Sequence, residues 1–176
     1  MGTGTEVDWE IIHGNNPTLP LQSLQLMMDE KLRALEPIEH TADELEWAAT
    51  IRESLGEDAP ELARAQQVED YAVLTGYGST DVGDVSRAVP TVSVRTATWV
   101  PGTAAHSWQA VAASGHSYGT KGTQHAAKVM VLAAVELYTN PQLRETAKAE
   151  FAEARGADYV YESLLGDRKP PLDYRK

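Results

Sequence analysis

The acidic residues of the chain are concentrated in one part of it. The segment 36–70 carries 11 acidic and 2 basic residues, whereas the segment 71–134 carries two acids and four basic residues. A run of one charge is usually a solvated surface, so we expect 36–70 to form exposed helices. The weakly charged segment 71–134, rich in Gly, Ser, Thr and Val, is expected to form buried strands and the loops between them. Such loops are where binding and catalytic residues usually lie.

The overall composition excludes several classes of protein. The 176 residues are 42% hydrophobic and 23% charged, which predicts one globular domain with a sizeable core. A net charge of −11 argues against a nucleic-acid partner. The longest uncharged apolar run is too short to span a membrane, and the first residues lack the pattern of a signal peptide. Without cysteine the chain forms neither disulfides nor thiolate metal sites, and a cytoplasmic location is expected.

Apolar spacing and capping residues predict the helices. Thr41 and Glu44 form a capping box, and Asn140 followed by Pro141 is a typical helix start. The segment 124–138 is apolar nearly all round, which predicts a deeply buried helix. We expect helices over 21–35, 41–56, 124–138 and 140–156, and a shorter one over 60–67.

Alternating residues predict strands between these helices. Val7, Trp9 and Ile11 alternate with acidic residues, which is typical of a strand with one exposed face. Further short strands are expected over 71–74, 91–94 and 96–100. The mixture of strands and helices predicts an α/β fold, a mixed sheet flanked by helices.

Three of the five histidines, His106, His116 and His125, fall within twenty residues of one another. Neutral imidazole is a common zinc ligand, but spacings of ten and nine residues match no compact zinc motif. These residues alone therefore give little support to a site made of three histidines.

Two other positions could carry chemistry. Asp81 lies in a glycine-rich loop, where a carboxylate can orient a ligand or accept a proton, or can simply bond the backbone of its own turn. The second interpretation is favoured when the residues are considered alone. Lys121, between Gly119 and Gly122, could help to bind an anion at a helix start, although a plain helix start is the simpler interpretation. A phosphate-binding loop and a nucleophile elbow are absent from the sequence.

Three motifs taken in order resemble a known family. They are GSTDVGDVS at 78–86, TWVPGTAAHSWQ at 98–109 and KGTQHAAKVM at 121–130. This series resembles the C-terminal part of the co-catalytic metallo-amidohydrolases, which include glutamate carboxypeptidases, aminoacylases and peptidase T. Within that family it is most similar to the aminobenzoyl-glutamate utilisation protein B branch. The resemblance covers nearly the whole chain.

The resemblance implies a function and assigns residues to it. Members of the family bind two divalent metals, usually zinc with manganese as an alternative, and a metal-bridging water attacks an amide carbonyl. His106 matches the last metal ligand, and Asp81 matches an acidic loop beside the active site, for which we infer a supporting role without metal ligation. Residues 1–16 would be the last strand of an inserted lid and dimerisation domain with its hinge. Residues 17–176 would be the C-terminal portion of a zinc-peptidase-like catalytic domain.

The chain also departs from the family pattern. The remaining metal ligands, the bridging carboxylate and the general-base glutamate have no counterpart here. We therefore expect this chain to be inactive alone and to need a missing N-terminal portion or a partner subunit, forming a dimer when complete. The implied substrate is a small N-acyl amino acid such as aminobenzoyl-glutamate. The alternative is a non-catalytic partner subunit with the same fold.

Overall fold

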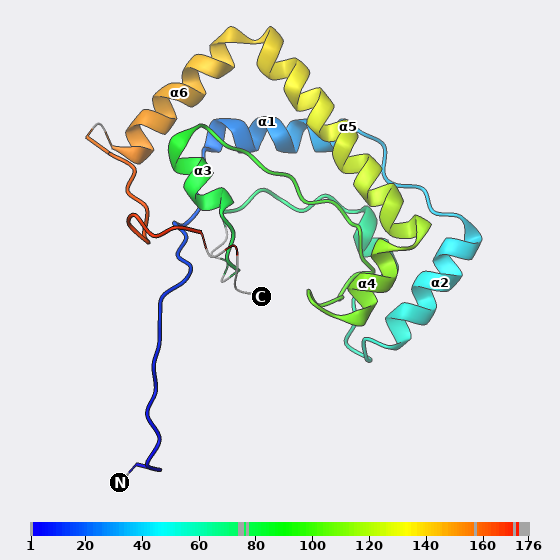
Figure 1. Ribbon diagram of the computed structural model, residues 1–176. Coiled ribbons are helices and arrows are strands. Elements are labelled where there is room, and N and C mark those ends of the chain that lie inside the picture. The colour runs from blue at the N-terminus through cyan, green and yellow to red at the C-terminus, as the bar shows by residue number, and fades with distance from the viewer. Residues whose placement is uncertain (1, 74–75, 77, 157, 171, 173–176) are drawn as a thin grey trace.

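The computed structural model describes residues 2–73, 76, 78–156, 158–170 and 172. These residues form helices joined by extended or irregular segments (Figure 1). The helices are α1 (Gln22–Arg33), α2 (Ala42–Glu53), the 3-10 helix η1 (Leu62–Gln66), α3 (Val82–Ala88), α4 (Trp108–Ser114), α5 (Ser117–Thr139) and α6 (Pro141–Arg155). Among the described residues no helix is long and apolar enough to cross a membrane.

The expectation of an α/β fold with a mixed sheet is wrong, because the described part of the chain is helical and contains no strand. The segments 91–94 and 96–100 are not assigned as strands, because a strand needs backbone hydrogen bonds to a neighbour and no described segment supplies them. Val92 and Val94 instead pack against a core made by helices. Of the expected strand 71–74, residues 71–73 are not a strand and Leu74 lies outside the described residues.

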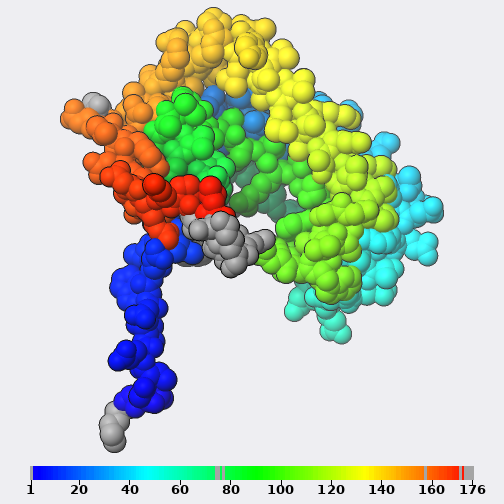
Figure 2. Space-filling model, viewed as in Figure 1, coloured from blue at the N-terminus to red at the C-terminus, as the bar shows by residue number. Residues whose placement is uncertain are grey.

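The N-terminal segment is an arm that extends away from the helices (Figure 2). Val7, Trp9 and Ile11 are 82%, 79% and 62% exposed, so their alternation with acidic residues does not reflect a buried face. The prediction of a strand in this segment is therefore also wrong, because residues 7–11 form no strand.

The first of two hydrophobic cores lies where α1, α5 and α6 meet. The helix expected over 21–35 is confirmed as α1, and its residues Leu24, Met27 and Met28 are buried. Val129 and Ala133 of α5 and Phe151 of α6 complete the contact. Asn140 accepts a hydrogen bond from Leu143 N at 3.0 Å and caps α6 directly after α5 ends, as its sequence predicts.

Helix α5 differs from its expectation in two ways. It begins at Ser117, seven residues before the expected start. It is also not buried all round, because Val131, Val135 and Tyr138 are 62%, 54% and 86% exposed. An apolar sequence thus forms a helix with only one side in the core.

The second core joins α2 to the beginning of α5. Ala48 and Ile51 of α2 pack with Val100 and Tyr118, all of them buried. The first turns of α5 lie very close to the backbone of Ala97 and Ala113. Positions 119 and 122 must therefore be glycine, since a Cβ at 119 would collide with the carbonyl of Ala113 and a Cβ at 122 with that of Ala97. These contacts fix α4 and the preceding extended segment against the first turns of α5.

Candidate functional site

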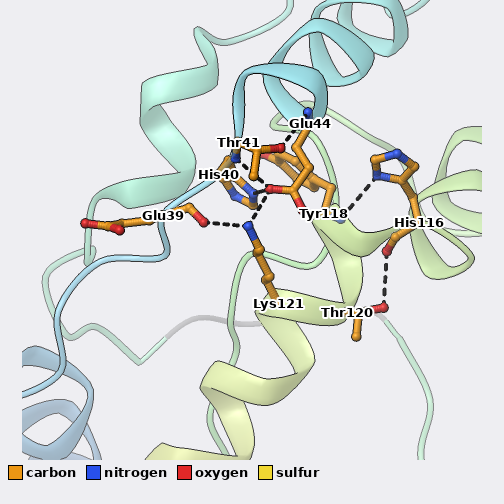
Figure 3. Close-up of polar contacts among 8 residues, drawn as sticks. All are labelled: Glu39, His40, Thr41, Glu44, His116, Tyr118, Thr120 and Lys121. Atoms are coloured by element: carbon orange, nitrogen blue, oxygen red, sulfur yellow. Dashed lines mark hydrogen bonds and ion pairs between the residues drawn. The ribbon is translucent and has the colours of Figure 1, made fainter.

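A cluster of charged and aromatic side chains lies where α2 meets the start of α5 (Figure 3). We call it the α2–α5 cluster; it comprises His40, Glu44, Trp47, His116, Tyr118 and Lys121. Thr41 N donates to Glu44 Oε2 at 2.8 Å and Glu44 N donates to Thr41 Oγ1 at 3.3 Å, so the expected capping box is present. Lys121 Nζ donates to the same Oε2 at 2.6 Å and to the carbonyl of Glu39 at 2.9 Å. The cluster thereby connects two helices that are far apart in sequence.

The environment of Glu44 strongly favours its ionised form. Hydrogen bonds from Lys121 and Ser117 hold the pKa of this carboxyl at about 2, although its burial acts in the opposite direction. The side chain is 6% exposed, in contrast to the solvated surface expected for the acidic segment 36–70. Lys121 is correspondingly engaged with a carboxylate of its own chain and is not free to bind an external anion.

His40 is buried beside this ion pair. Its ring stacks on Tyr118 with centroids 4.0 Å apart and planes inclined by 8°. Its Nδ1 lies 3.5 Å from Glu44 Oε2 and has no hydrogen-bond partner among the described residues. Desolvation lowers the pKa of His40, despite the nearby carboxylate, and so favours the neutral imidazole.

His116 belongs to the same cluster. Its Nδ1 accepts a hydrogen bond from Tyr118 N at 3.1 Å, which makes it the N-cap of α5. Its ring stacks on Trp47 with centroids 4.0 Å apart and planes inclined by 6°. The sequence singled out His116 as one of three neighbouring histidines, and the structure places it at a contact between helices.

The cluster is not suited to hold a metal as it stands. Lys121 Nζ already lies beside the buried carboxylate, where a cation would bind. More broadly, the described residues contain no group of three or more His, Asp or Glu side chains placed to hold a metal ion. Zinc sites use three or four protein ligands, so the donor set described here does not complete one.

Asp81 is exposed and directly precedes α3. Its side chain makes no capping hydrogen bond, while its backbone carbonyl accepts from Asp84 N at 3.0 Å. The side-chain bond to its own turn, favoured from the sequence, is therefore not seen at the helix start. The carboxylate remains accessible to a ligand.

The neighbouring Asp84 has a clear role that the sequence analysis missed. Asn16 Nδ2 donates to it at 2.7 Å and Tyr161 OH donates to it at 3.1 Å. The hydrogen bond from Asn16 is the main reason that the pKa of Asp84 is lowered. Ser86, two residues further on in α3, accepts from Leu19 N at 2.8 Å. Helix α3 thus holds the segment that follows the N-terminal arm; the polar Asn15-Asn16 pair was the signal available in the sequence.

His106 is exposed on the loop before α4 and has a strained backbone. Its φ of +61° is in the left-handed region, and no other non-glycine residue in the described part of the chain has a positive φ. The next residue, Ser107, caps α4 by accepting from Ala110 N at 3.2 Å. His125 is half-buried within α5, and the described residues do not combine it with His106 in a metal-binding group.

A hollow of about 730 Å³ lies between α1 and α6, away from these residues. Glu150 lines it and accepts from Ser23 N at 3.0 Å and from Ser23 Oγ at 2.5 Å, and it also accepts from Gln22 N. These bonds replace the missing side-chain cap of α1. Neither Asp81 nor His106 lines this hollow.

Comparison with known proteins gives one informative similarity. The chain matches no protein-family model. It also matches no solved structure. It is 27% identical, over an alignment of 173 residues, to a subunit of the p-aminobenzoyl-glutamate hydrolase of Escherichia coli (strain K12). The alignment covers 84% of this chain and 36% of that protein, so the chain spans about a third of its relative's length. This chain is therefore similar to part of a hydrolase subunit.

Proposed function

We propose that the chain forms part of a metal-dependent amidohydrolase that cleaves p-aminobenzoyl-glutamate or a related N-acyl amino acid. The observation that carries this proposal is the similarity to the p-aminobenzoyl-glutamate hydrolase subunit across 84% of the chain. The relative extends well beyond the aligned region, which leaves room for the remaining catalytic groups in another portion or another subunit. By the resemblance to the metallo-amidohydrolases, residues 1–16 belong to a lid and hinge and 17–176 to the catalytic portion.

His106 is the residue that we propose as a metal ligand of this chain. It is exposed, and its left-handed backbone is a conformation that proteins retain where function or packing requires it. One imidazole does not hold zinc by itself, so the other ligands would come from the polypeptide corresponding to the rest of the relative. A bound divalent metal would activate water for attack on the amide. Asp81 is proposed to orient groups beside that site through its accessible carboxylate.

The test combines this chain with the portion of the Escherichia coli relative that lies outside the alignment. Each part alone, and the mixture, is incubated with zinc or manganese and p-aminobenzoyl-glutamate, and release of p-aminobenzoate is measured. We expect the chain alone to release no p-aminobenzoate and the mixture to release it. His106→Ala should abolish turnover and remove bound metal, while the matched control His125→Ala should do neither.

Two results would contradict the proposal. Metal-dependent turnover by the isolated chain would show that it holds a complete site of its own. Unchanged metal content and turnover in the His106→Ala mixture would show that His106 is not a ligand.

A second candidate is a non-catalytic partner subunit. It is favoured by the absence, among the described residues, of any group able to hold a metal. In that case the assembled enzyme would keep its full metal content and rate when both Asp81→Asn and His106→Ala are introduced into this chain. Metal analysis of the assembly therefore separates the two candidates.

A further inference from the structure

Helix α5 carries an exposed apolar face on the side opposite its buried residues. Val131, Val135 and Tyr138 recur at helical spacing and point away from Val129 and Ala133, which lie in the core. We call this side the α5 outer face; it comprises the exposed residues Ala127, Val131, Ala134, Val135 and Tyr138. None of these five side chains is charged, although a helix side that faces water usually carries charged residues.

A hollow of about 400 Å³ lies at one edge of the α5 outer face. It is lined by Leu35, which follows α1, and by Ala127, Lys128, Val131 and Leu132 of α5. Four of these five residues are apolar. The hollow is therefore suited to receive an apolar side chain from a partner that lies along the helix.

The sequence of α5 is that of a helix covered on all sides. A helix that is hydrophobic nearly all round is usually buried in the complete protein, whereas α5 is buried on one side only. Contiguous exposed apolar surface of this kind marks a site of interaction in soluble proteins. The α5 outer face is thus a surface that lacks its cover in the isolated chain.

The similarity to the Escherichia coli hydrolase subunit indicates what covers it. The alignment spans 84% of this chain but only 36% of that protein, so the larger part of the relative lies outside the aligned region. A second copy of this chain is less suited, because two molecules with a net charge of −11 repel one another. A lipid surface is also disfavoured, since helices that lie on membranes are rich in Lys and Arg, while α5 has two lysines and one of them, Lys121, is paired with Glu44.

We propose that the α5 outer face binds the polypeptide that corresponds to the unaligned portion of the Escherichia coli relative, through an apolar surface that covers Val131, Val135 and Tyr138. This inference rests on the proposed function, because it takes the partner from the same hydrolase. It adds to that function the surface on which the two parts of the enzyme meet.

The first experiment measures whether the α5 outer face is covered in the complex. The tagged chain is co-expressed with the portion of the Escherichia coli relative that lies outside the alignment, and the amount of that portion that co-purifies is measured. Because the chain contains no cysteine, Val131→Cys introduces its only thiol, and the rate at which this thiol reacts with a maleimide reports its exposure. We expect the rate to fall about tenfold in the complex, because the centre of an interface excludes water. Val160→Cys, at a position that is 75% exposed after α6, is the matched control and should react equally fast with and without the partner.

The second experiment places charge on the same face. Val131 and Val135 are both exposed, so the double variant Val131→Glu, Val135→Glu should leave the urea unfolding curve of the isolated chain unchanged. Co-purification of the partner should fall about tenfold or more, because binding would bury two unpaired carboxylates. Val160→Glu introduces the same charge elsewhere on the surface and should leave co-purification intact.

The outcomes separate this inference from the proposed function. A complex that protects position 131 but releases no p-aminobenzoate would support the inference and contradict the proposed function. Co-purification and turnover that are undiminished in the double variant would overturn the inference while the proposed function stands. Failure of the unmodified chain to retain the partner, or an unchanged thiol reaction at position 131 in the complex, would also overturn it.

Other occupants of the face are tested on the isolated chain. Self-association in sedimentation velocity that disappears in the double variant would assign the face to a second copy. Flotation with phosphatidylcholine vesicles that the double variant abolishes would assign it to a lipid surface. Either result would overturn the inference.

Discussion

Glu44 performs two tasks that usually fall to different residues. It closes the capping box at the start of α2 and it pairs with Lys121 of α5. Because the side chain is almost inaccessible, its oxygens must be satisfied within the protein. The capping box could be predicted because Thr41 and Glu44 are only three positions apart. The ion-pair partner of Glu44, Lys121, is 77 positions away, and no local sequence pattern indicates it.

Replacement of Glu44 by Gln should destabilise the chain by about 1–3 kcal/mol, because Lys121 loses a charged partner in a partly buried place. Urea unfolding at pH 7 measures the change. Asp43→Asn is the matched control, since this acid lies beside Glu44 in the first turn but is exposed. Equal losses in the two variants would mean that only charge at the helix start matters.

The pH dependence of the same residue gives a second test. The folded chain holds the pKa of Glu44 at about 2, below its ordinary value of 4.5. The ionised carboxylate of Glu44 therefore stabilises the folded state. Its contribution to the free energy of unfolding is complete above the ordinary pKa and is lost as the pH falls through about 2. The unfolding free energy of the unmodified chain should fall more steeply over this window than that of Glu44→Gln, as measured by urea unfolding. Parallel curves would contradict the assignment.

At the strained position, His106→Gly should raise the unfolding free energy by up to about 1 kcal/mol, because glycine adopts positive φ without steric cost. His106→Val should lower it, since a branched side chain is unfavourable there. Thermal unfolding of the two variants checks the order. A less stable glycine variant would show that the His106 side chain itself contributes to folding.

At the scale of elements, α5 organises its neighbours by allowing backbone to approach it closely. Thr96 Oγ1 donates to the carbonyl of Gly122 at 3.0 Å, on the side where this helix has no side chain. The extended segment before α4 is therefore held by a helix surface and not by a neighbouring strand.

Gly122→Ala should cost about 1–3 kcal/mol, because its Cβ would collide with the carbonyl of Ala97 and force the segment away. Gly115→Ala is the control, since a Cβ there meets nothing closer than an ordinary van der Waals contact. Chemical denaturation of both variants gives the comparison. A cost at position 115 as large as at 122 would indicate a general loss of glycine flexibility instead of a collision.

Helices could be predicted from the sequence because their signals are local. The capping box and the Asn140-Pro141 start both appear where expected. Strands were wrongly predicted because an extended apolar segment need not pair with another segment. Val92 and Val94 are partly buried against a helical core, whereas Val7, Trp9 and Ile11 are exposed. Pairing depends on a second segment, which the alternation does not identify. For the same reason the α2–α5 cluster was missed, while the site roles of Asp81 and His106 stay predictions.

At the scale of the whole molecule, the residues that the structure describes form two separate cores that share one helix. Phe151 and Val129 belong to the core of α1, α5 and α6, whereas Ile51 and Tyr118 belong to the core at the other end of α5. Among the described residues, no buried residue belongs to both cores. Local stability can therefore differ between the ends of the same helix.

Phe151→Ala should remove about 3–5 kcal/mol from the core of α1, α5 and α6. We expect hydrogen exchange to accelerate in α1, α6 and the C-terminal half of α5, while α2 keeps its protection. Ile51→Ala is the reciprocal control and should affect α2 first. Uniform acceleration along the chain in both variants would show that the two cores unfold as a single unit.

The hydrogen bonds of Asp84 have a mechanical consequence. Asn16 and Tyr161 are 145 positions apart in sequence, yet both are fastened to this one carboxylate on α3. Near them, Arg168 pairs with Glu10 at 2.6 Å. A force that pulls the N-terminal arm away from the segment after α6 would act first on these contacts of Asp84 and on the Arg168–Glu10 ion pair. The two hydrophobic cores would bear no force until these contacts broke.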